Sequence, residues 1–377
     1  MESRKEKFVN DFYCESFNES SEMLAALKEL DEDSTWVGGV DAKSIKVLPI
    51  ENFPLMADSI AEKLGCDKSA ILDTMSHTLL AISFNGVTYP LRNTAMKSLF
   101  ERAEVTGGVI RKLSPEELSQ LFALCLPKAN GNALVLIRGK KVSAVLSDNN
   151  GGYEHLPMQE LMNRTEQMLA QRFGNKAQFV VGEISHSFMS ARYVINEPRL
   201  LKEYEALTKD SAYGGPYTPQ LAIYTSDVGT CSATIAASLR TARGATIRIN
   251  GELTVSHKKG ASLDAFSEKL EETFAKYVEF TTRLGKLAEI EVSDPCKAFM
   301  LAQEKAGLPK KLAKKALEDF RMYVGDEPSN AHDIYLGLCE ILFYAKSSGY
   351  NEKDLCRLED LLARCLTFNW TEWEDWE

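Results

Sequence analysis

Ala133-Leu-Val-Leu-Ile-Arg138, Gly139-Lys140 and Lys141-Val-Ser-Ala-Val-Leu-Ser147 form the stretch that decides the fold class of this chain. Two apolar runs rich in Val, Leu and Ile are separated by a Gly-Lys pair. A two-residue connection that contains glycine, placed between such runs, is typical of a β-hairpin. Asn85-Gly86 separates two earlier runs in the same way. The sequence therefore predicts antiparallel strands joined by tight turns.

The strand pattern continues to about residue 260 and then changes period. Short apolar runs at 179–181, 188–195, 221–225, 233–240, 246–249 and 253–256 predict further strands, and Asn250-Gly251 marks a turn between the last two. From Ser262, which can cap a helix, apolar residues recur every three or four positions. Further helices are predicted at 295–306, 309–323, 331–347 and 352–366. The expected fold class is α+β: a mixed or antiparallel hairpin-rich sheet with packed helices, followed by an all-α C-terminal region.

Four regions are expected along the chain. A length of 377 residues favours two or three domains. We expect an N-terminal α+β region over 1–110 and a central hairpin-rich core over 111–261. A helical region over 262–366 and an acidic aromatic tail over 367–377 follow.

Composition excludes several classes of protein. The 44 Lys and Arg against 54 Asp and Glu give a net charge of -10, which excludes a uniformly basic nucleic-acid coat. No run of 18 apolar residues predicts a membrane span, and residues 1–10 lack the apolar run of a secretory signal. The eight cysteines are widely spaced, so we expect reduced thiols and a cytoplasmic protein.

Motifs for cofactors and metals are missing from the sequence. It has no phosphate-binding loop, no dinucleotide-binding glycine pattern, no hydrolase serine elbow and no His-Glu-x-x-His. The five histidines are scattered, and no cysteine pair has the spacing of a zinc ribbon. We therefore expect no cofactor and no dedicated metal site.

Residues 219–261 are basic within an acidic chain. Five cations stand against Asp227 and Glu252, a local charge of +3. Such a face can neutralise phosphates, although a solvated surface paired with acids of the C-terminal helices is an open alternative. The expected phosphate contacts are Arg240, Arg243, Arg248, Lys258 and Lys259, with His257 and Tyr224 as residues that can stack on a base.

A second basic cluster lies in the predicted helix over 309–323. Lys310, Lys311, Lys314 and Lys315 fall on one side of that helix and can follow a phosphate backbone. The alternative is that Glu318 and Asp319, within helical reach, neutralise them.

The tail carries Trp370, Trp373 and Trp376 between acidic residues. Exposed tryptophan is expected to meet a partner. Three alternatives stay open: docking onto another protein, occupying the chain's own basic groove in place of nucleic acid, or packing back onto the helical region.

Four ordered motifs carry a family resemblance. They are Arg138-Gly-Lys-Lys-Val-Ser-Ala-Val-Leu-Ser-Asp148, Ser226-Asp-Val-Gly229, Asn250-Gly251 and His257-Lys-Lys-Gly260. Their order across about 90–292 resembles a phage- and plasmid-associated family, one of the domain-of-unknown-function families. The resemblance implies an origin on a mobile genetic element and names no activity. The chain departs from the family at Asn149-Asn150-Gly151-Gly152, where an Arg-Tyr pair is usual, and at Arg248, where the family tends to have Cys.

Three hypotheses for function follow. The first is a binding protein that presents a basic sheet groove to single-stranded DNA, in DNA maintenance or annealing. The second is an enzyme on nucleotides or nucleic acid, in which Asp148, Asp227 and His257 converge as a metal or acid–base cluster. The third is a protein–protein module, such as a host-defence inhibitor or scaffold, that docks through the tail. A role without catalysis is favoured, and the oligomeric state is left open.

Overall fold

The large sheet is the centre of the molecule. The computed structural model describes residues 4–149, 152–213, 215–242, 245–251, 253–325 and 327–371. Seven strands pair antiparallel throughout, and β12 and β13 share one edge of β11. The strand order is β1 (Cys14–Phe17), β8 (Ala177–Ser185), β9 (Phe188–Ile195), β10 (Tyr217–Thr225), β11 (Ala233–Thr241) and β12 (Thr246–Arg248), with β13 (Leu253–Val255) beside β12.

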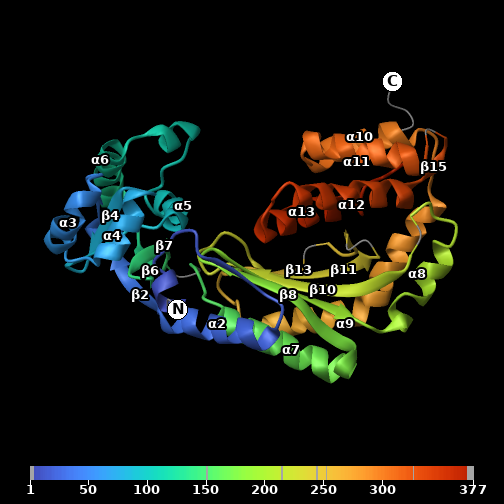
Figure 1. Ribbon diagram of the computed structural model, residues 1–377, viewed down its shortest axis with the longest axis horizontal. Coiled ribbons are helices and arrows are strands. Elements are labelled where there is room, and N and C mark those ends of the chain that lie inside the picture. The colour runs from blue at the N-terminus through green and yellow to red at the C-terminus, as the bar shows by residue number, and fades with distance from the viewer. Residues whose placement is uncertain are drawn as a thin grey trace.

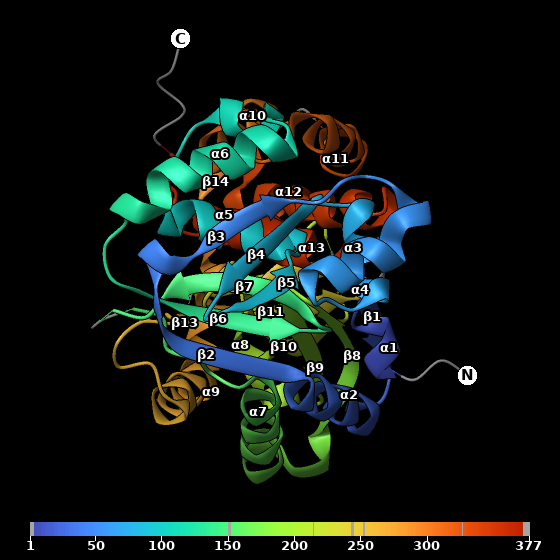
Figure 2. The same cartoon turned by 90° about the vertical axis from the view of Figure 1, so that its left-hand side faces the viewer.

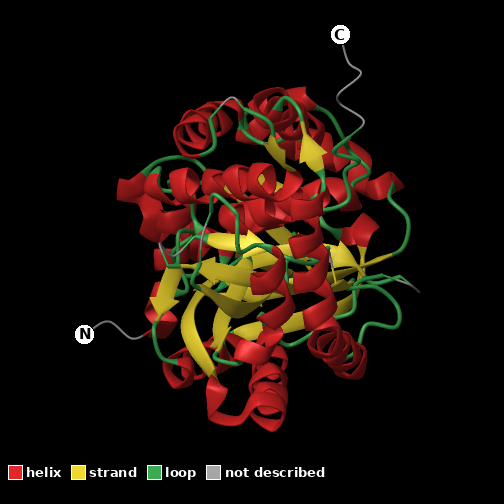
Figure 3. Cartoon of the chain, turned by 90° about the vertical axis from the view of Figure 1, so that its right-hand side faces the viewer, coloured by secondary structure: helices red, strands yellow, loops and turns green. Residues whose placement is uncertain are grey.

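Helices cover both faces of this sheet (Figures 1 and 3). The lower face in Figure 1 carries α2 (Ser20–Glu32), α7 (Met158–Phe173) and α9 (Leu263–Lys286). The upper face carries α12 (Ala331–Ser347) and α13 (Glu352–Cys365), with α10 (Pro295–Ala306) and α11 (Lys310–Tyr323) outside them. Because both faces are covered, β9, β10 and β11 are buried along almost their whole length.

A smaller lobe lies beside the large sheet, on the left in Figure 1 and facing the viewer in Figure 2. It has its own hydrophobic core. One three-stranded sheet has the order β2 (Ser34–Asp41), β6 (Asn132–Arg138) and β7 (Lys141–Ser147), and the other has the order β3 (Lys46–Pro49), β4 (Leu80–Phe84) and β5 (Val87–Pro90). Its helices are α3 (Ala57–Leu64), α4 (Lys68–Met75), α5 (Asn93–Arg102) and α6 (Pro115–Cys125).

Both predicted hairpins are confirmed. The central residues of each turn have positive φ: 50° and 78° at Asn85 and Gly86, and 56° and 60° at Gly139 and Lys140. This is the conformation that matches the twist of the flanking strands.

The predicted boundary at residue 110 does not separate two sheets. Strand β2 lies before that residue and β6 after it, yet the two pair from Ser34↔Arg138 to Asp41↔Asn132. The small lobe therefore contains residues 34–147 of the chain. A pairing across about a hundred residues leaves no local signal in the sequence.

The C-terminal helices begin and end close to the predicted positions. Ser262 caps α9 by accepting a hydrogen bond from the Ala265 amide at 3.0 Å. The remaining short elements are α1 (Arg4–Lys7), α8 (Lys202–Leu207), β14 (Glu291–Val292) and β15 (Ser329–Asn330). The expected α+β class with a helical C-terminal region is confirmed.

Candidate binding groove

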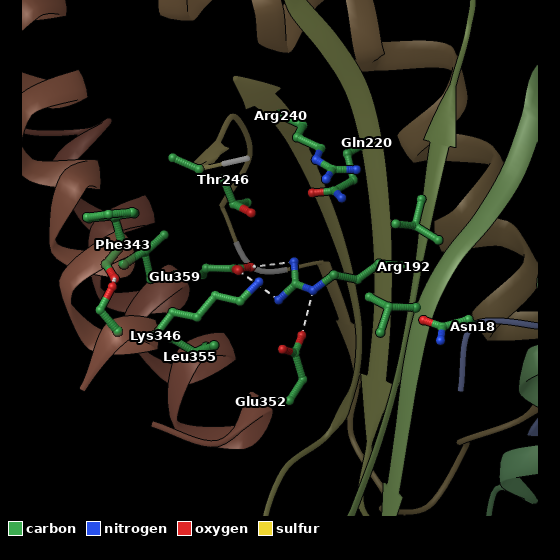
Figure 4. A pocket seen from close by; sticks show the side chains of 15 residues that line it. Asn18, Arg192, Gln220, Arg240, Thr246, Phe343, Lys346, Glu352, Leu355 and Glu359 are labelled. Atoms are coloured by element: carbon green, nitrogen blue, oxygen red, sulfur yellow. Dashed lines mark hydrogen bonds and ion pairs between the residues drawn. The ribbon is translucent and has the colours of Figure 1, made fainter. Parts of the chain in front are cut away.

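A cavity of about 640 Å³ opens between the upper face of the large sheet and the helices α12 and α13 (Figure 4). In β10 and β11, Gln220 and Arg240 point to the same face, because Gln220 pairs with Ser238 and side chains alternate along a strand. Arg192 of β9 shares this face, since it lies opposite Ala222. Helices α12 and α13 contribute Phe343, Lys346, Glu352 and Glu359 to the other wall. We call this cavity the sheet–helix groove.

Arg192 lies deep in the groove, and two carboxylates neutralise its charge. Its Nε donates to Glu352 Oε1 at 2.5 Å and its Nη2 donates to Glu359 Oε1 at 2.7 Å. Burial lowers the pKa of Arg192, but the two carboxylates outweigh burial and hold that pKa well above its ordinary value. Arg192 therefore stays charged and fixes α13 to the sheet, with little charge left for a ligand.

Two cations on the walls are available to a ligand. Arg240 and Lys346 are exposed, and within the described part of the chain neither side chain has a hydrogen bond or an ion pair. They come from opposite walls, one from β11 and one from α12 (Figure 4). Phe343, one helical turn before Lys346, is 47% exposed. The groove therefore offers two positive charges and an aromatic ring to an anionic ligand.

Aromatic contacts connect the groove with the lysines of α11. The Phe343 and Tyr344 rings lie 5.5 Å apart in an edge-to-face arrangement. Lys315 Nζ lies 5.6 Å from the centre of the Tyr344 ring. Asp319 accepts a hydrogen bond from the Tyr344 hydroxyl and has no ion pair with the α11 lysines in the described residues. Lys310, Lys311, Lys314 and Lys315 are all exposed.

Arg248 and Tyr224 lie beneath α13 and do not face water. Arg248 is fully buried, donates from Nε to the Asn250 side-chain oxygen at 2.9 Å and places Nη1 3.5 Å from Asp360. Tyr224 donates its hydroxyl to the same carboxylate at 2.5 Å. This is a correction to the predicted phosphate and stacking roles: a helix packed above the sheet neutralises this part of the basic segment.

The remaining cations of the basic segment do not share one strip. Arg240 pairs with Thr246 at one end of β11, while Ala233, at the other end, pairs with Val255. Lys258 and Lys259 are exposed and follow that second end. Seven residues of strand span about 23 Å. Arg243 lies outside the described residues.

The three acid–base candidates are not joined by any contact among the described residues. Asp148 accepts a hydrogen bond from the Gly39 amide at 2.6 Å. Asp227 is buried and forms an ion pair with Arg138. His257 is buried and its ring stacks on Tyr153 at 4.9 Å. Each side chain is therefore explained by structural contacts: Asp148 within the small lobe, Asp227 through its ion pair with Arg138 of that lobe, and His257 by ring packing.

His257 and Asp227 nevertheless share an electrostatic environment. The His257 ring nitrogens lie 3.1 Å from Thr225 Oγ1 and 3.1 Å from the Glu154 carbonyl oxygen. Burial lowers the pKa of His257, and the hydrogen bond with the Glu154 backbone and the charge of Asp227 oppose that effect only in part. A neutral imidazole with both nitrogens engaged is typical of a structural histidine.

Asp11, Asp73 and His77 are the one group of three or more described His, Cys, Asp or Glu side chains whose potential ligand atoms all lie within 4.8 Å of one another. The ammonium of Lys141 already lies among them, 2.5 Å from Asp11 and 2.6 Å from Asp73. Burial raises the pKa of Asp11, but Arg92 and Lys141 outweigh it and the pKa is lowered. A lysine cation therefore already neutralises two of the three candidate ligands, and the cluster is explained as an ion network.

Trp370 packs against the helical region and is 1% exposed. Trp373 and Trp376 lie outside the described residues. Among the described residues, no helix combines the length and apolar character that crossing a bilayer requires.

Comparisons with protein-family models, with curated proteins and with solved structures give no match. The resemblance to a phage- and plasmid-associated family stays a prediction.

Sequence reasoning missed Arg192, Phe343 and Lys346. Arg192 is the only charged residue in the apolar strand Phe188–Ile195, and a lone charge in a buried strand indicates an ion pair. Glu352 and Glu359, seven residues apart on one helix face, are its natural partners. Phe343 and Lys346 have no comparable local signal, since their role depends on where α12 crosses the sheet.

Proposed function

We propose that the sheet–helix groove binds single-stranded nucleic acid. The observation that carries this proposal is the pair Arg240 and Lys346, whose side chains are exposed on opposite walls without a partner among the described residues, beside the half-exposed ring of Phe343. Cations that neutralise the backbone, combined with aromatic rings that stack on bases, are what single-strand binding requires.

The shape of the site supports a single strand over a duplex. The groove lies between the sheet on one side and α12 and α13 on the other, so a ligand must enter between two walls (Figure 4). A strand with unstacked bases can do so, because its bases and phosphates are separately accessible. Next to Phe343, the ring of Tyr344 and the ammonium of Lys315 add a second aromatic group and a third cation, which continue the surface from α12 to α11.

The cysteines bear on where in the cell the protein would act. All eight cysteines are unpaired, and burial raises the pKa of Cys66 to about 11 and that of Cys231 to about 12. Inert reduced thiols suit a cytoplasmic location. A role in DNA annealing or maintenance on a phage or plasmid would use sequence-independent binding of this kind.

The proposal is tested by fluorescence anisotropy with a labelled oligothymidine of about 20 nucleotides, titrated at about 50 and 200 mM salt. The R240A/K346A variant is expected to bind at least about tenfold more weakly, and the slope of log affinity against log salt is expected to fall by about 1.4, as two lost phosphate contacts require. The F343A variant should weaken binding by about 1–3 kcal/mol and leave that slope unchanged, since stacking involves no counterion.

The matched control is K258A/K259A, which removes the same charge at the far end of β11. It is expected to change affinity by less than about threefold, because screening limits the effect of distant charges. Absence of binding by the parent protein at low salt, or equal losses in the two double variants, would contradict the proposal.

A further inference from the structure

A second pocket lies on the outer surface, between α10 and α11, on the uppermost helices in Figure 1. It has a volume of about 250 Å³ and is separate from the sheet–helix groove in its lining residues. Its floor is apolar: Phe299 is buried, Leu317 is partly buried, and Met300 is 48% exposed. An open apolar floor of this kind is suited to a large hydrophobic side chain.

Lys310 and Lys314 stand on the rim of this pocket. They are one helical turn apart and exposed, and neither side chain has a hydrogen bond or an ion pair with another residue that the structure describes. Glu304 is the single acid on the lining, so the rim is positive on balance. The occupant that fits is therefore an acidic peptide with an apolar anchor.

The chain carries such a peptide, and the described residues just before it lie against α10. Glu372-Trp373-Glu374-Asp375-Trp376-Glu377 has four carboxylates and two tryptophans. The described chain leads into it beside α10, because the Phe368 ring lies 4.9 Å from Lys305 Nζ and Trp370 is buried in the helical core.

The distances allow the contact. Six residues reach about 20 Å when extended. Along α10, the five residues from Lys305 back to Met300 cover only about 8 Å. The segment is therefore long enough to place a tryptophan over Met300 and its carboxylates beside the two lysines.

We propose that residues 372–377 bind in the α10–α11 pocket of their own chain, with a tryptophan on the apolar floor and the carboxylates paired with Lys310 and Lys314. The proposal is independent of the nucleic-acid proposal, since the two sites share no lining residue.

Photocrosslinking in the full-length protein tests this contact. Benzoylphenylalanine is placed at position 373, the protein is irradiated at low concentration, and the crosslinked peptides are identified by mass spectrometry. The expected product is an intramolecular link to the peptide that contains Met300 or to the neighbouring α11 peptide. K310E/K314E is expected to lower the yield by about tenfold, because two attractions become repulsions.

K311E/K315E is the matched control: it makes the same charge change on the same helix, outside the pocket lining, and is expected to leave the yield unchanged. A combined variant with K310E/K314E and lysines in place of Glu374 and Asp375 is expected to recover the link if charge pairing holds the segment. Links only between two chains, links to other surfaces, or equal yields in both lysine variants would overturn the proposal.

Discussion

Buried charges distinguish this chain at the scale of single residues. Arg92, Arg138, Lys141 and Arg248 are fully buried, and Arg192 is nearly so. Each meets at least one carboxylate from a segment far away in sequence. A buried pair adds little net stability, but the loss of one partner leaves an unpaired charge in a medium that solvates it poorly. These residues therefore determine which elements can pack together.

Arg192→Met is expected to lower the free energy of unfolding by about 3–5 kcal/mol, because the buried Glu359 carboxylate loses its partner. Arg240→Met, on the same sheet face but exposed, is expected to change it by less than about 0.5 kcal/mol. Urea unfolding followed by circular dichroism measures both. Equal effects of the two substitutions would show that the ion pair with α13 is unimportant.

Asp31 gives a pH dependence of stability. Burial raises its pKa from 3.8 to about 6; Arg138 opposes this effect and Asp227 adds to it. The folded protein binds this proton more tightly than the unfolded chain does. The resulting stabilisation is therefore present below about pH 4 and is lost as the pH rises through about 6.

Asp31→Asn is expected to be more stable than the parent by about 1–2 kcal/mol at about pH 7.5, after allowance for partial solvent screening, with the difference shrinking toward about pH 4.5. Urea unfolding of both proteins across this pH range measures it. A difference that is constant with pH would contradict the titration of Asp31.

At the scale of elements, the β6–β7 turn does more than reverse the chain. Gly139 has a φ of 56°, and a Cβ at this position would overlap the carbonyl of Phe8. Gly86 in the β4–β5 turn has a φ of 78° and open space around it. Both turns need the left-handed region, but only the first also packs against the N-terminal segment.

Gly86→Ala is expected to cost about 1–2 kcal/mol of unfolding free energy, the price of positive φ for a residue with a Cβ. Gly139→Ala is expected to cost clearly more, since the backbone of Phe8 must also move. Thermal unfolding of the two variants compares them. If Gly139→Ala lowers the unfolding free energy no more than Gly86→Ala does, the backbone at Phe8 can move aside without loss of stability.

Elements were predictable where the signal is local. The Asn85-Gly86 and Gly139-Lys140 turns and the Ser262 cap were found because they depend on backbone conformation within a few residues. The pairing of β2 with β6 was not, because it joins distant segments. For the same reason, Arg248 looked like a surface cation, although α13 covers it. Only Arg240 of the sheet–helix groove was anticipated as a binding residue.

At the scale of the whole molecule, polar contacts tie the small lobe to the large sheet. Arg138 at the end of β6 pairs with Asp227 and donates to the His186 carbonyl at 3.4 Å. Lys141 and Arg92 bind Asp11 of the N-terminal segment. The two lobes have separate main hydrophobic cores, and a small apolar cluster of Leu136, Ala144, Leu146 and Val228 joins them. The polar contacts therefore add to the coupling of two units that could otherwise unfold apart.

Arg138→Met is expected to split the unfolding of the protein into two calorimetric transitions, because Asp227 loses its partner at the contact between the lobes. Lys140→Met is the control: Lys140 is exposed and its ion pair with Asp67 stays within the small lobe. We expect it to unfold in one transition, as we expect of the parent. One transition in both variants would show that apolar packing alone couples the lobes.

The large sheet ends in short strands on both sides. At one edge the four residues of β1 cover residues 182–185 of β8, and the three-residue strands β12 and β13 divide the other edge between them. A long regular edge strand would offer a row of unpaired amides and carbonyls to a neighbouring chain. A short or interrupted edge strand leaves few backbone groups free for such pairing. A sheet this apolar should consequently resist strand-by-strand aggregation and stay dispersed when the protein is concentrated.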